Sequence, residues 1–385
     1  LLTGVENAVS GFNATAGSID WEWKAPRAGG EIAVTAGSHR RVGSRFLSGG
    51  SAGRALWEFA AMRETGEGSV EGGDFDLERV SGRIEYPLGA GRLRLFGGFL
   101  EKFYGWPGMY TGFPSLLETD AYSVSLLGAQ WESGDRDFGN GRQAHRVGGY
   151  WRRLDDDYEF DRLQPNRLFE HLTEVWSLQG DGFLEHSGWA LSYRWVLLRD
   201  ALLRSTSLVN GRFDERDYAK GSLLASRTVS LEIGGLTLHG GLVADHTSEE
   251  GTAWSPQAGV ALSGITGSAY WKAFTTYSEA TRVPGYTVLN SAPSGLFGGN
   301  PGLGRETARS WEAGFSVDKD PYSLRLVVFQ RRDRDLVDWV YDSDSPSARQ
   351  AAAMNLTVRG LETSLGMVKG PYRIEAAYAW LEKDP

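Results

Sequence analysis

Hydrophobic and polar residues alternate with a period of two along many stretches of this chain. Residues 189–197 read WALSYRWVL, with a large apolar side chain at every odd position and smaller or polar side chains at most positions between. Similar alternation runs through 310–318, 360–367 and 372–380. Successive side chains of a β-strand point to opposite faces, so this pattern predicts strands with one apolar and one polar face.

The alternating segments are numerous and long. We predict about seventeen strands, many of about 10–14 residues, whereas strands of soluble proteins usually have about 5–6. Their ranges are 30–38, 43–49, 54–64, 74–86, 91–103, 118–132, 143–154, 168–180, 187–199, 216–233, 236–247, 252–263, 267–278, 307–318, 322–336, 352–368 and 371–382. The fold class that follows is all-β.

The connections between these strands are of two kinds. Short turns are predicted at 87–91, 234–235, 264–267, 318–321 and 369–371, and long connections at 103–118, 155–167, 200–215, 279–307 and 337–350. Short and long connections alternate along the chain, which is typical of a transmembrane antiparallel β-barrel. A soluble β-sandwich also has alternating strands, but it does not sort its loops in this way.

Composition and charge narrow the choice further. The chain has no cysteine, so disulfides and thiolate metal sites are excluded. Its net charge of −9 is spread over well-mixed signs, which offers no basic face to a nucleic acid. No apolar run approaches the roughly 20 residues of a membrane helix. The 14 Trp, 15 Tyr and 17 Phe fit the aromatic girdles of a barrel, with outer-membrane lipids as its surroundings.

Four motifs in the last third of the chain resemble the barrel of TonB-dependent outer-membrane receptors. They read YSEATRVPGY at 277–286, GNPGLGRETARSWEAGF at 299–315, RDLVDW at 334–339 and VRGLETSLG at 358–366. The matching positions are Tyr277, Ala280, Arg282 and Pro284, then Asn300, Pro301, Leu303 and Glu306, then Glu312 and Gly314, and finally Gly360, Leu361 and Glu362. One position departs from the family pattern, because Arg305 stands where the family often has proline.

The resemblance implies a domain organisation. Residues 1–28, with GVENAVSGFNATAGSIDWEWKAP, resemble the C-terminal end of a plug domain, and residues 29–385 would form the barrel. A full barrel of this family has 22 strands, so we expect the chain to be cut before the last strands. The resemblance also implies the outer membrane of a Gram-negative bacterium and a TonB-type energy-transducing partner in the inner membrane.

The function implied by the resemblance is energy-dependent uptake of a scarce small molecule, such as a ferric siderophore, cobalamin or a related nutrient. A passive, porin-like diffusion channel is the alternative. The sequence contains no nucleotide-binding motif, no Gly-x-Ser-x-Gly elbow and no His-Glu-x-x-His motif. We therefore predict no enzymatic activity, no cofactor and no metal site.

Two long connections are candidates for ligand binding. In EKFYGWPGMYTGF at 101–113, Tyr104, Trp106 and Tyr110 could stack on a planar or sugar-like ligand, or they could belong to an aromatic girdle. In the connection 279–307, Arg282 and Tyr286 are the candidates, since arginine can pair with a carboxylate or phosphate of a ligand. The acidic run LDDDYEFDR at 154–162 could hold Ca²⁺, but a solvated outer loop is favoured.

Overall fold

A computed structural model describes residues 25–164, 168–294, 297–341 and 348–384. The predicted end of the plug domain, apart from residues 25–28, lies outside this range. The strands are β1 (Gly29–Ala36), β2 (Val42–Ala52), β3 (Ala55–Gly66), β4 (Phe75–Leu88), β5 (Gly91–Gly105), β6 (Thr119–Glu132), β7 (Arg136–Phe138), β8 (Gly141–Glu159), β9 (Leu168–His186), β10 (Trp189–Ser205), β11 (Glu215–Leu231), β12 (Gly234–Thr247), β13 (Gly251–Thr266), β14 (Ala269–Arg282), β15 (Phe297–Gly298), β16 (Glu306–Lys319), β17 (Tyr322–Tyr341), β18 (Arg349–Lys369) and β19 (Tyr372–Asp384).

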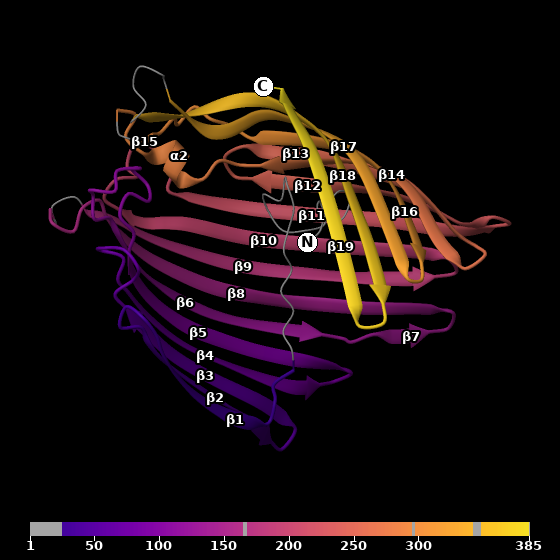
Figure 1. Ribbon diagram of the computed structural model, residues 1–385, viewed down its shortest axis with the longest axis horizontal. Helices are drawn as coiled ribbons and strands as arrows, with labels where there is room; N and C mark the ends of the chain where they lie inside the picture. The colour runs from indigo at the N-terminus through magenta and orange to yellow at the C-terminus, as the bar shows by residue number, and fades with distance from the viewer. Residues whose placement is uncertain (1–24, 165–167, 295–296, 342–347, 385) are drawn as a thin grey trace.

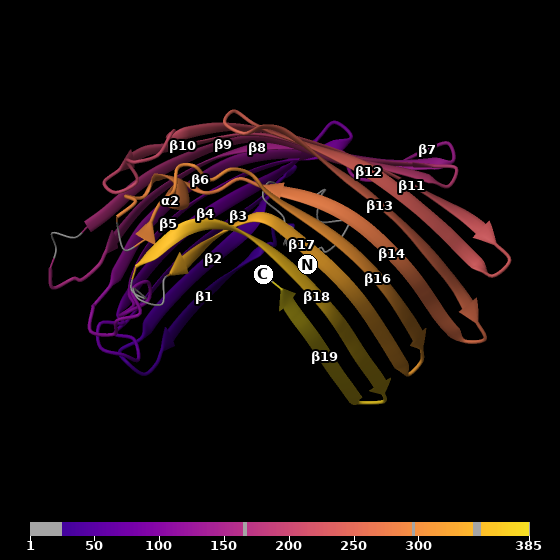
Figure 2. The same ribbon diagram turned by 90° about the horizontal axis from the view of Figure 1, so that it is seen from above.

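These strands form one strongly curved sheet that arches over a concave space (Figures 1 and 2). Each long strand pairs antiparallel with the next long strand along the chain, from β1 to β19. The short strand β15 adds a two-residue parallel pairing to β18. The all-β antiparallel architecture predicted from the alternation is confirmed.

The predicted strand positions agree closely with the observed ones. Each of the seventeen predicted segments corresponds to one long strand. The sequence analysis missed β7 and β15, which have three and two residues, because a segment that short shows no periodicity.

The connections sort to the two ends of the strands, as predicted. Tight turns such as Gly89–Ala90 and Gly370–Pro371 join neighbouring strands at one end, and Gly89 and Gly370 adopt positive φ angles of 62° and 60°. Glycine suits such turns because it has no Cβ to clash. The connections 106–118 and 283–305 lie at the opposite end, on the left of Figure 1. We call these ends the short-turn end and the long-loop end.

All five predicted long connections are shorter than expected, three of them by five residues or more at the end of the preceding strand. Residues 155–159 continue β8, residues 200–205 continue β10, and residues 337–341 continue β17. The prediction of a solvated acidic loop at 154–162 is therefore wrong for residues 154–159, which belong to β8. This segment keeps its ladder on both sides, since Asp155 lies opposite Ser123 of β6 and opposite Leu172 of β9.

The convex outer face carries an apolar band. Its exposed side chains include Trp57, Phe59, Ile84, Phe99, Leu127, Trp176, Leu178, Leu197, Trp311 and Phe315. Toward the long-loop end the band stops at an aromatic pair, Trp151 and Trp176, whose ring centroids are 6.2 Å apart. Beyond this level charged pairs take over, with Arg204 3.2 Å from Asp155 and Arg309 3.2 Å from Glu279.

The concave inner face is more polar, and the connection 283–305 packs against it. This connection contains the short helix α2 (Tyr286–Asn290), which lies inside the arch in Figure 2. Leu289 and Leu303 of the connection form a small buried cluster with Val337 of β17 and Ala351 of β18. Within the described ranges, no helix has the length and apolar character needed to cross a membrane.

Candidate ligand-binding surface at the long-loop end

Tyrosines and carboxylates gather on the inner face at the long-loop end of β5, β6 and β8. Tyr104 of β5 lies directly opposite Asp120 of β6, which in turn lies opposite Tyr158 of β8. Directly paired residues of antiparallel strands project to the same face. The strand register therefore brings these three side chains together, although they are far apart in the sequence.

The candidates Tyr104, Trp106 and Tyr110 all belong to this cluster. The Tyr104 hydroxyl donates a 2.7 Å hydrogen bond to Oδ2 of Asp120, and the Tyr110 hydroxyl lies 3.5 Å from the same oxygen. The Tyr110 ring packs edge-on against Tyr158 at a centroid distance of 5.0 Å. Trp106 packs against Tyr104 at 6.2 Å. The structure thus builds one aromatic and acidic surface from three strands and a loop.

Glu118 fixes the loop 106–117 over this surface. Its side chain is only 1% exposed and accepts hydrogen bonds from the backbone N–H of Tyr110 (2.9 Å) and of Thr111 (3.1 Å). The hydroxyls of Thr111 and Tyr158 donate to it as well. Burial, together with the charge of Asp120, raises the pKa of Tyr110. The Tyr110 hydroxyl therefore remains a neutral donor at physiological pH.

Arg282 lies in a second cluster and is engaged within the protein. Its Nε lies 2.8 Å from Oε1 of Glu306, which is itself buried, and its Nη2 donates a 3.4 Å hydrogen bond to the Val337 carbonyl. Arg282 is the last residue of β14 and Glu306 the first of β16, so the ion pair joins the two ends of the connection 283–305. The role of Arg282 toward a ligand anion stays a prediction, and in the structure its guanidinium pairs with the carboxylate of Glu306.

Tyr286 is also held by the inner wall. Its hydroxyl donates to the carboxylate of Asp200 and lies 3.2 Å from the Asp200 carbonyl oxygen. The guanidinium of Arg216 lies 4.6 Å from the Tyr286 ring centroid and donates a 2.6 Å hydrogen bond to the Pro284 carbonyl. Burial and the hydrogen bond to Asp200 raise the pKa of Tyr286. These contacts pin α2 to β10 and β11.

The five predicted residues therefore form two groups rather than one. Tyr104, Trp106 and Tyr110 come together on β5 and the following loop. Arg282 and Tyr286 lie on the other half of the sheet, where Arg282 pairs with Glu306 of β16 and Tyr286 packs against β10 and β11. Trp106 is 54% exposed and can meet a ligand directly. The prediction that Tyr104 lies in a loop is wrong, since β5 extends to Gly105 and keeps Tyr104 in its ladder.

Sequence reasoning missed the residues that organise both groups. In the first group these are Glu118 and Asp120, and for Tyr286 they are Asp200 and Arg216. The local pattern did not single out Asp120, because it shares a strand face with Tyr122, Val124 and Leu126. Its partners could be recognised only from the register of three strands.

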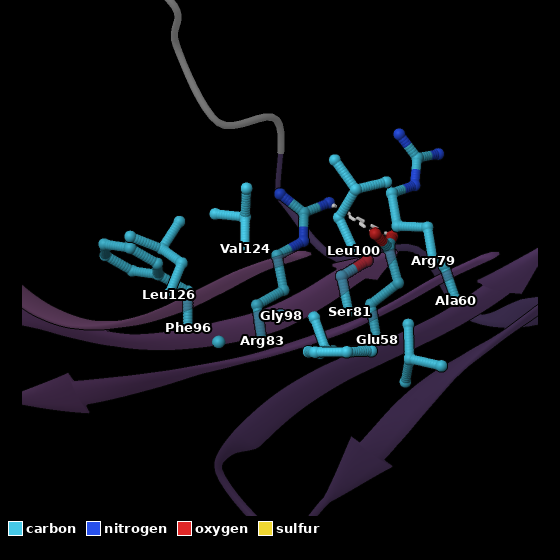
Figure 3. Close-up of a pocket in the computed structure, with 14 residues that line it drawn as sticks. Glu58, Ala60, Arg79, Ser81, Arg83, Phe96, Gly98, Leu100, Val124 and Leu126 are labelled. Carbon is cyan, nitrogen blue, oxygen red and sulfur yellow. Dashed lines mark hydrogen bonds and ion pairs between the residues drawn. The ribbon is translucent and has the colours of Figure 1, made fainter. Parts of the chain in front are cut away.

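Closer to the short-turn end, the inner face of β3 to β6 carries a pocket of about 210 Å³ (Figure 3). Phe96, Leu126 and Val124 form its apolar side. Arg83 and Glu58 cross it as an ion pair with an Nη2–Oε1 distance of 3.0 Å. The inner face thus offers both apolar and charged positions along the concave space. Across the described ranges, no group of three or more acidic or histidine side chains is arranged to hold a metal ion.

Comparisons with known proteins agree with this architecture. The family model described as TonB dependent receptor-like, beta-barrel matches residues 64–385. The chain therefore belongs to this family of TonB-dependent receptor β-barrels. No curated protein matches the chain.

Solved structures of similar fold include several receptors. The crystal structure of the siderophore receptor PirA from Pseudomonas aeruginosa has a TM-score of 0.75 at 16% identity, over 100% of this chain and 72% of that one. A ferric enterobactin receptor mutant from Pseudomonas aeruginosa, in complex with enterobactin, has a TM-score of 0.68 at 16% identity, over 98% and 66%. The copper transporter OprC has a TM-score of 0.68 at 14% identity, over 97% and 65%. This chain thus spans between 65% and 72% of the length of these three proteins.

Proposed function

We propose that this protein is an outer-membrane receptor for the energy-dependent uptake of a scarce small molecule, such as a ferric siderophore, cobalamin or a related nutrient. The observation that carries the proposal is the family match over residues 64–385, in a sheet whose long-loop end presents an ordered aromatic and acidic surface. Solved structures of similar fold include a receptor in complex with enterobactin and a copper transporter, which supports a small-molecule ligand for this chain.

The two faces of the sheet support a location in the outer membrane of a Gram-negative bacterium. The apolar band of the outer face, bounded by Trp151 and Trp176, is suited to the hydrocarbon region of the membrane. The charged pairs beyond it would then stand on the extracellular side. A TonB-type protein of the inner membrane would supply the energy, through segments outside the residues that the structure describes.

We assign the first contact with ligand to the surface around Trp106 and Tyr110. Both side chains are exposed at the long-loop end, and the loop that carries them is fixed by Glu118. A rigid aromatic surface loses little conformational entropy when it binds. Arg282 and Tyr286 hold the connection 283–305 in place on the other half of the sheet.

Uptake measurements in cells test the proposal. The full-length gene would be deleted and restored, and accumulation of radiolabelled ferric siderophores, cobalamin and copper would be compared among the wild-type, deleted and restored strains. We expect accumulation of one compound to fall in the deletion strain and to recover on restoration. Equal accumulation of every compound in all three strains would contradict the proposal.

A further inference from the structure

The carboxylates on the inner face at the long-loop end fall into two groups, those with an arginine partner and those without one. On the β10 to β18 half, each of four inner-face carboxylates is matched by an arginine. The pairs, with their shortest distances, are Asp200 with Arg216 (3.5 Å), Asp245 with Arg305 (3.1 Å), Glu306 with Arg282 (2.8 Å) and Asp333 with Arg331 (2.6 Å). Arginine is thus the partner of each of these four carboxylates.

Asp120 and Asp156 on the β6 and β8 half differ from these four. Asp120 lies opposite Tyr158, and Asp156 lies two residues away on the same face of β8, so the two carboxyl groups are diagonal neighbours. Within the described part of the chain, no arginine, lysine or histidine lies within ion-pair distance of either group. Two neighbouring acidic groups here lack a positive partner.

Asp120 also has an unsatisfied oxygen. Its side chain is 8% exposed, and Oδ2 accepts from Tyr104, whereas Oδ1 is inaccessible to solvent and has no hydrogen-bond partner among the described residues. A buried carboxylate oxygen without a partner costs free energy, so such atoms usually mark a bound proton, ion or ligand group. Asp156 is only half-buried, which leaves the pair approachable from the concave side.

The other groups around the pair do not neutralise it. Lys102 of β5 places Nζ over the rings of Tyr104 (4.2 Å) and Tyr122 (5.5 Å) instead of at a carboxylate. His171 of β9 lies opposite Asp156, and its Nδ1 shares a 2.8 Å hydrogen bond with the Ser205 hydroxyl. Burial lowers the pKa of His171 and so favours its neutral form. Glu118, Asp155 and Asp157 add further negative charge nearby.

We propose that Asp120 and Asp156 form a recognition site for a positively charged nitrogen group, an ammonium or a guanidinium, of the transported ligand. This inference rests on the proposed import function and names the ligand's charge. The cation takes the place of a proton between the two carboxyl groups. The rings of Tyr110 and Tyr158 pack edge-on against each other next to Asp120, and aromatic rings favour cations.

A metal ion fits the site less well than an organic cation. No group of three or more histidine or acidic side chains among the described residues is arranged to hold a metal. A nitrogen cation needs only one or two carboxylates with aromatic neighbours. An anionic chelate would face two uncompensated carboxylates, and like charges oppose binding.

Calorimetric titration of the full-length protein in detergent tests this assignment. Spermidine is the cationic probe and citrate the anionic probe, at constant ionic strength and about pH 8, above the pKa of Asp156 of about 7. The variants Asp120→Asn and Asp156→Asn keep the side-chain shape and remove the charge. Asp181→Asn is the matched control, because Asp181 pairs with Arg146 (3.0 Å) toward the short-turn end.

We expect spermidine to bind the wild-type protein and the Asp181→Asn control equally, and each of the other variants at least about tenfold more weakly, with no binding of citrate. Affinity for spermidine should also rise from pH 6 to pH 8 in the wild type and stay level in Asp156→Asn. The assignment is overturned by spermidine affinity that both substitutions leave unchanged, by absent spermidine binding, by citrate binding, or by Ca²⁺ or Cu²⁺ binding at the pair in place of spermidine.

The uptake measurement separates this inference from the proposed function. Loss of uptake in the deletion strain for an anionic compound only would retain import and overturn the cation site. Spermidine binding that depends on Asp120 and Asp156, in a protein whose deletion changes no uptake, would retain the site and overturn import.

Discussion

Arg305 and Asp245 form an ion pair that is almost completely shielded from solvent. Nη1 of Arg305 lies 3.1 Å from Oδ1 of Asp245, and the two side chains are 11% and 6% exposed. Arg305 also donates a 2.9 Å hydrogen bond to the Gly251 carbonyl, so it joins the end of the connection 283–305 to β12 and β13. It stands at the position where similar receptors often carry proline, and the structure gives this departure a stabilising role.

Removal of Asp245 should therefore destabilise the protein strongly. In Asp245→Ala the guanidinium of Arg305 loses its carboxylate while it stays buried, which costs about 3–5 kcal/mol. The exposed pair of Arg199 and Glu215 provides the control, and Glu215→Ala should leave the free energy of unfolding nearly unchanged, because solvent screens this pair. The free energy of unfolding in urea, measured in lipid vesicles, distinguishes the two. Equal losses would show that the buried pair has no special role.

Glu118 should control the order of the loop 106–117. Glu118→Ala leaves the N–H groups of Tyr110 and Thr111 and the Tyr158 hydroxyl without their acceptor. Hydrogen bonds to a charged group are worth about 1.5–3 kcal/mol, so amide exchange in 106–117 should accelerate by about tenfold or more. Exchange detected by mass spectrometry measures this, with Glu67→Ala as an exposed control. Unchanged exchange in Glu118→Ala would refute the anchoring role.

Tyr286 should hold α2 through its hydroxyl. Tyr286→Phe keeps the ring beside Arg216 and removes the donor to Asp200, at a cost of about 1.5–3 kcal/mol. The free energy of unfolding and amide exchange in 286–294 report the loss. Tyr341→Phe, at an exposed end of β17, is the matched control and should change neither quantity. A wild-type exchange pattern in Tyr286→Phe would contradict this account.

Strand positions could be read from the sequence because the membrane-facing part of each strand alternates strictly. In β8 the alternation ends beyond Trp151, where charged residues occupy both faces, as with Asp155 outside and Asp156 inside. A strand without an apolar face has the composition of a loop. The sequence analysis therefore placed strand ends too early on this side.

The candidate surface was only partly predictable for a different reason. Aromatic residues such as Trp106 and Tyr110 stand out in a loop rich in glycine and proline. Asp120 could be recognised as part of the site only once Tyr104 and Tyr158 were known to lie beside it, and that proximity depends on the register of three strands. In the sequence Arg282 has no acidic partner that can be recognised, because Glu306 follows only after the long connection. Pairing of distant residues, rather than local pattern, decides these roles.

Asp156 should make stability depend on pH. It stands five residues beyond the apolar band, where burial, and next the neighbouring Asp120, raise its pKa from 3.8 to about 7. The folded protein therefore binds this proton more tightly than the unfolded chain does. The free energy of unfolding should fall as pH rises from about 4 to about 7, by on the order of 1–2 kcal/mol for a partly solvent-screened group.

The variant Asp156→Asn isolates this contribution. It removes the titrating group, so the fall in the free energy of unfolding between pH 4 and pH 7 should shrink relative to the wild type. Asp137→Asn, an exposed substitution near the short-turn end, should leave the wild-type slope in place. Identical slopes in the wild type and Asp156→Asn would contradict the raised pKa.

The central claim is that this receptor imports its ligand with energy from an inner-membrane partner. The most direct measurement is accumulation of the transported compound in cells that carry the full-length gene, with and without the TonB-type protein. Our account predicts that ligand still binds at the cell surface in both strains, and that accumulation falls to the level of the receptor deletion when the partner is absent. Accumulation that is unchanged by loss of the partner would identify a passive channel and contradict the account.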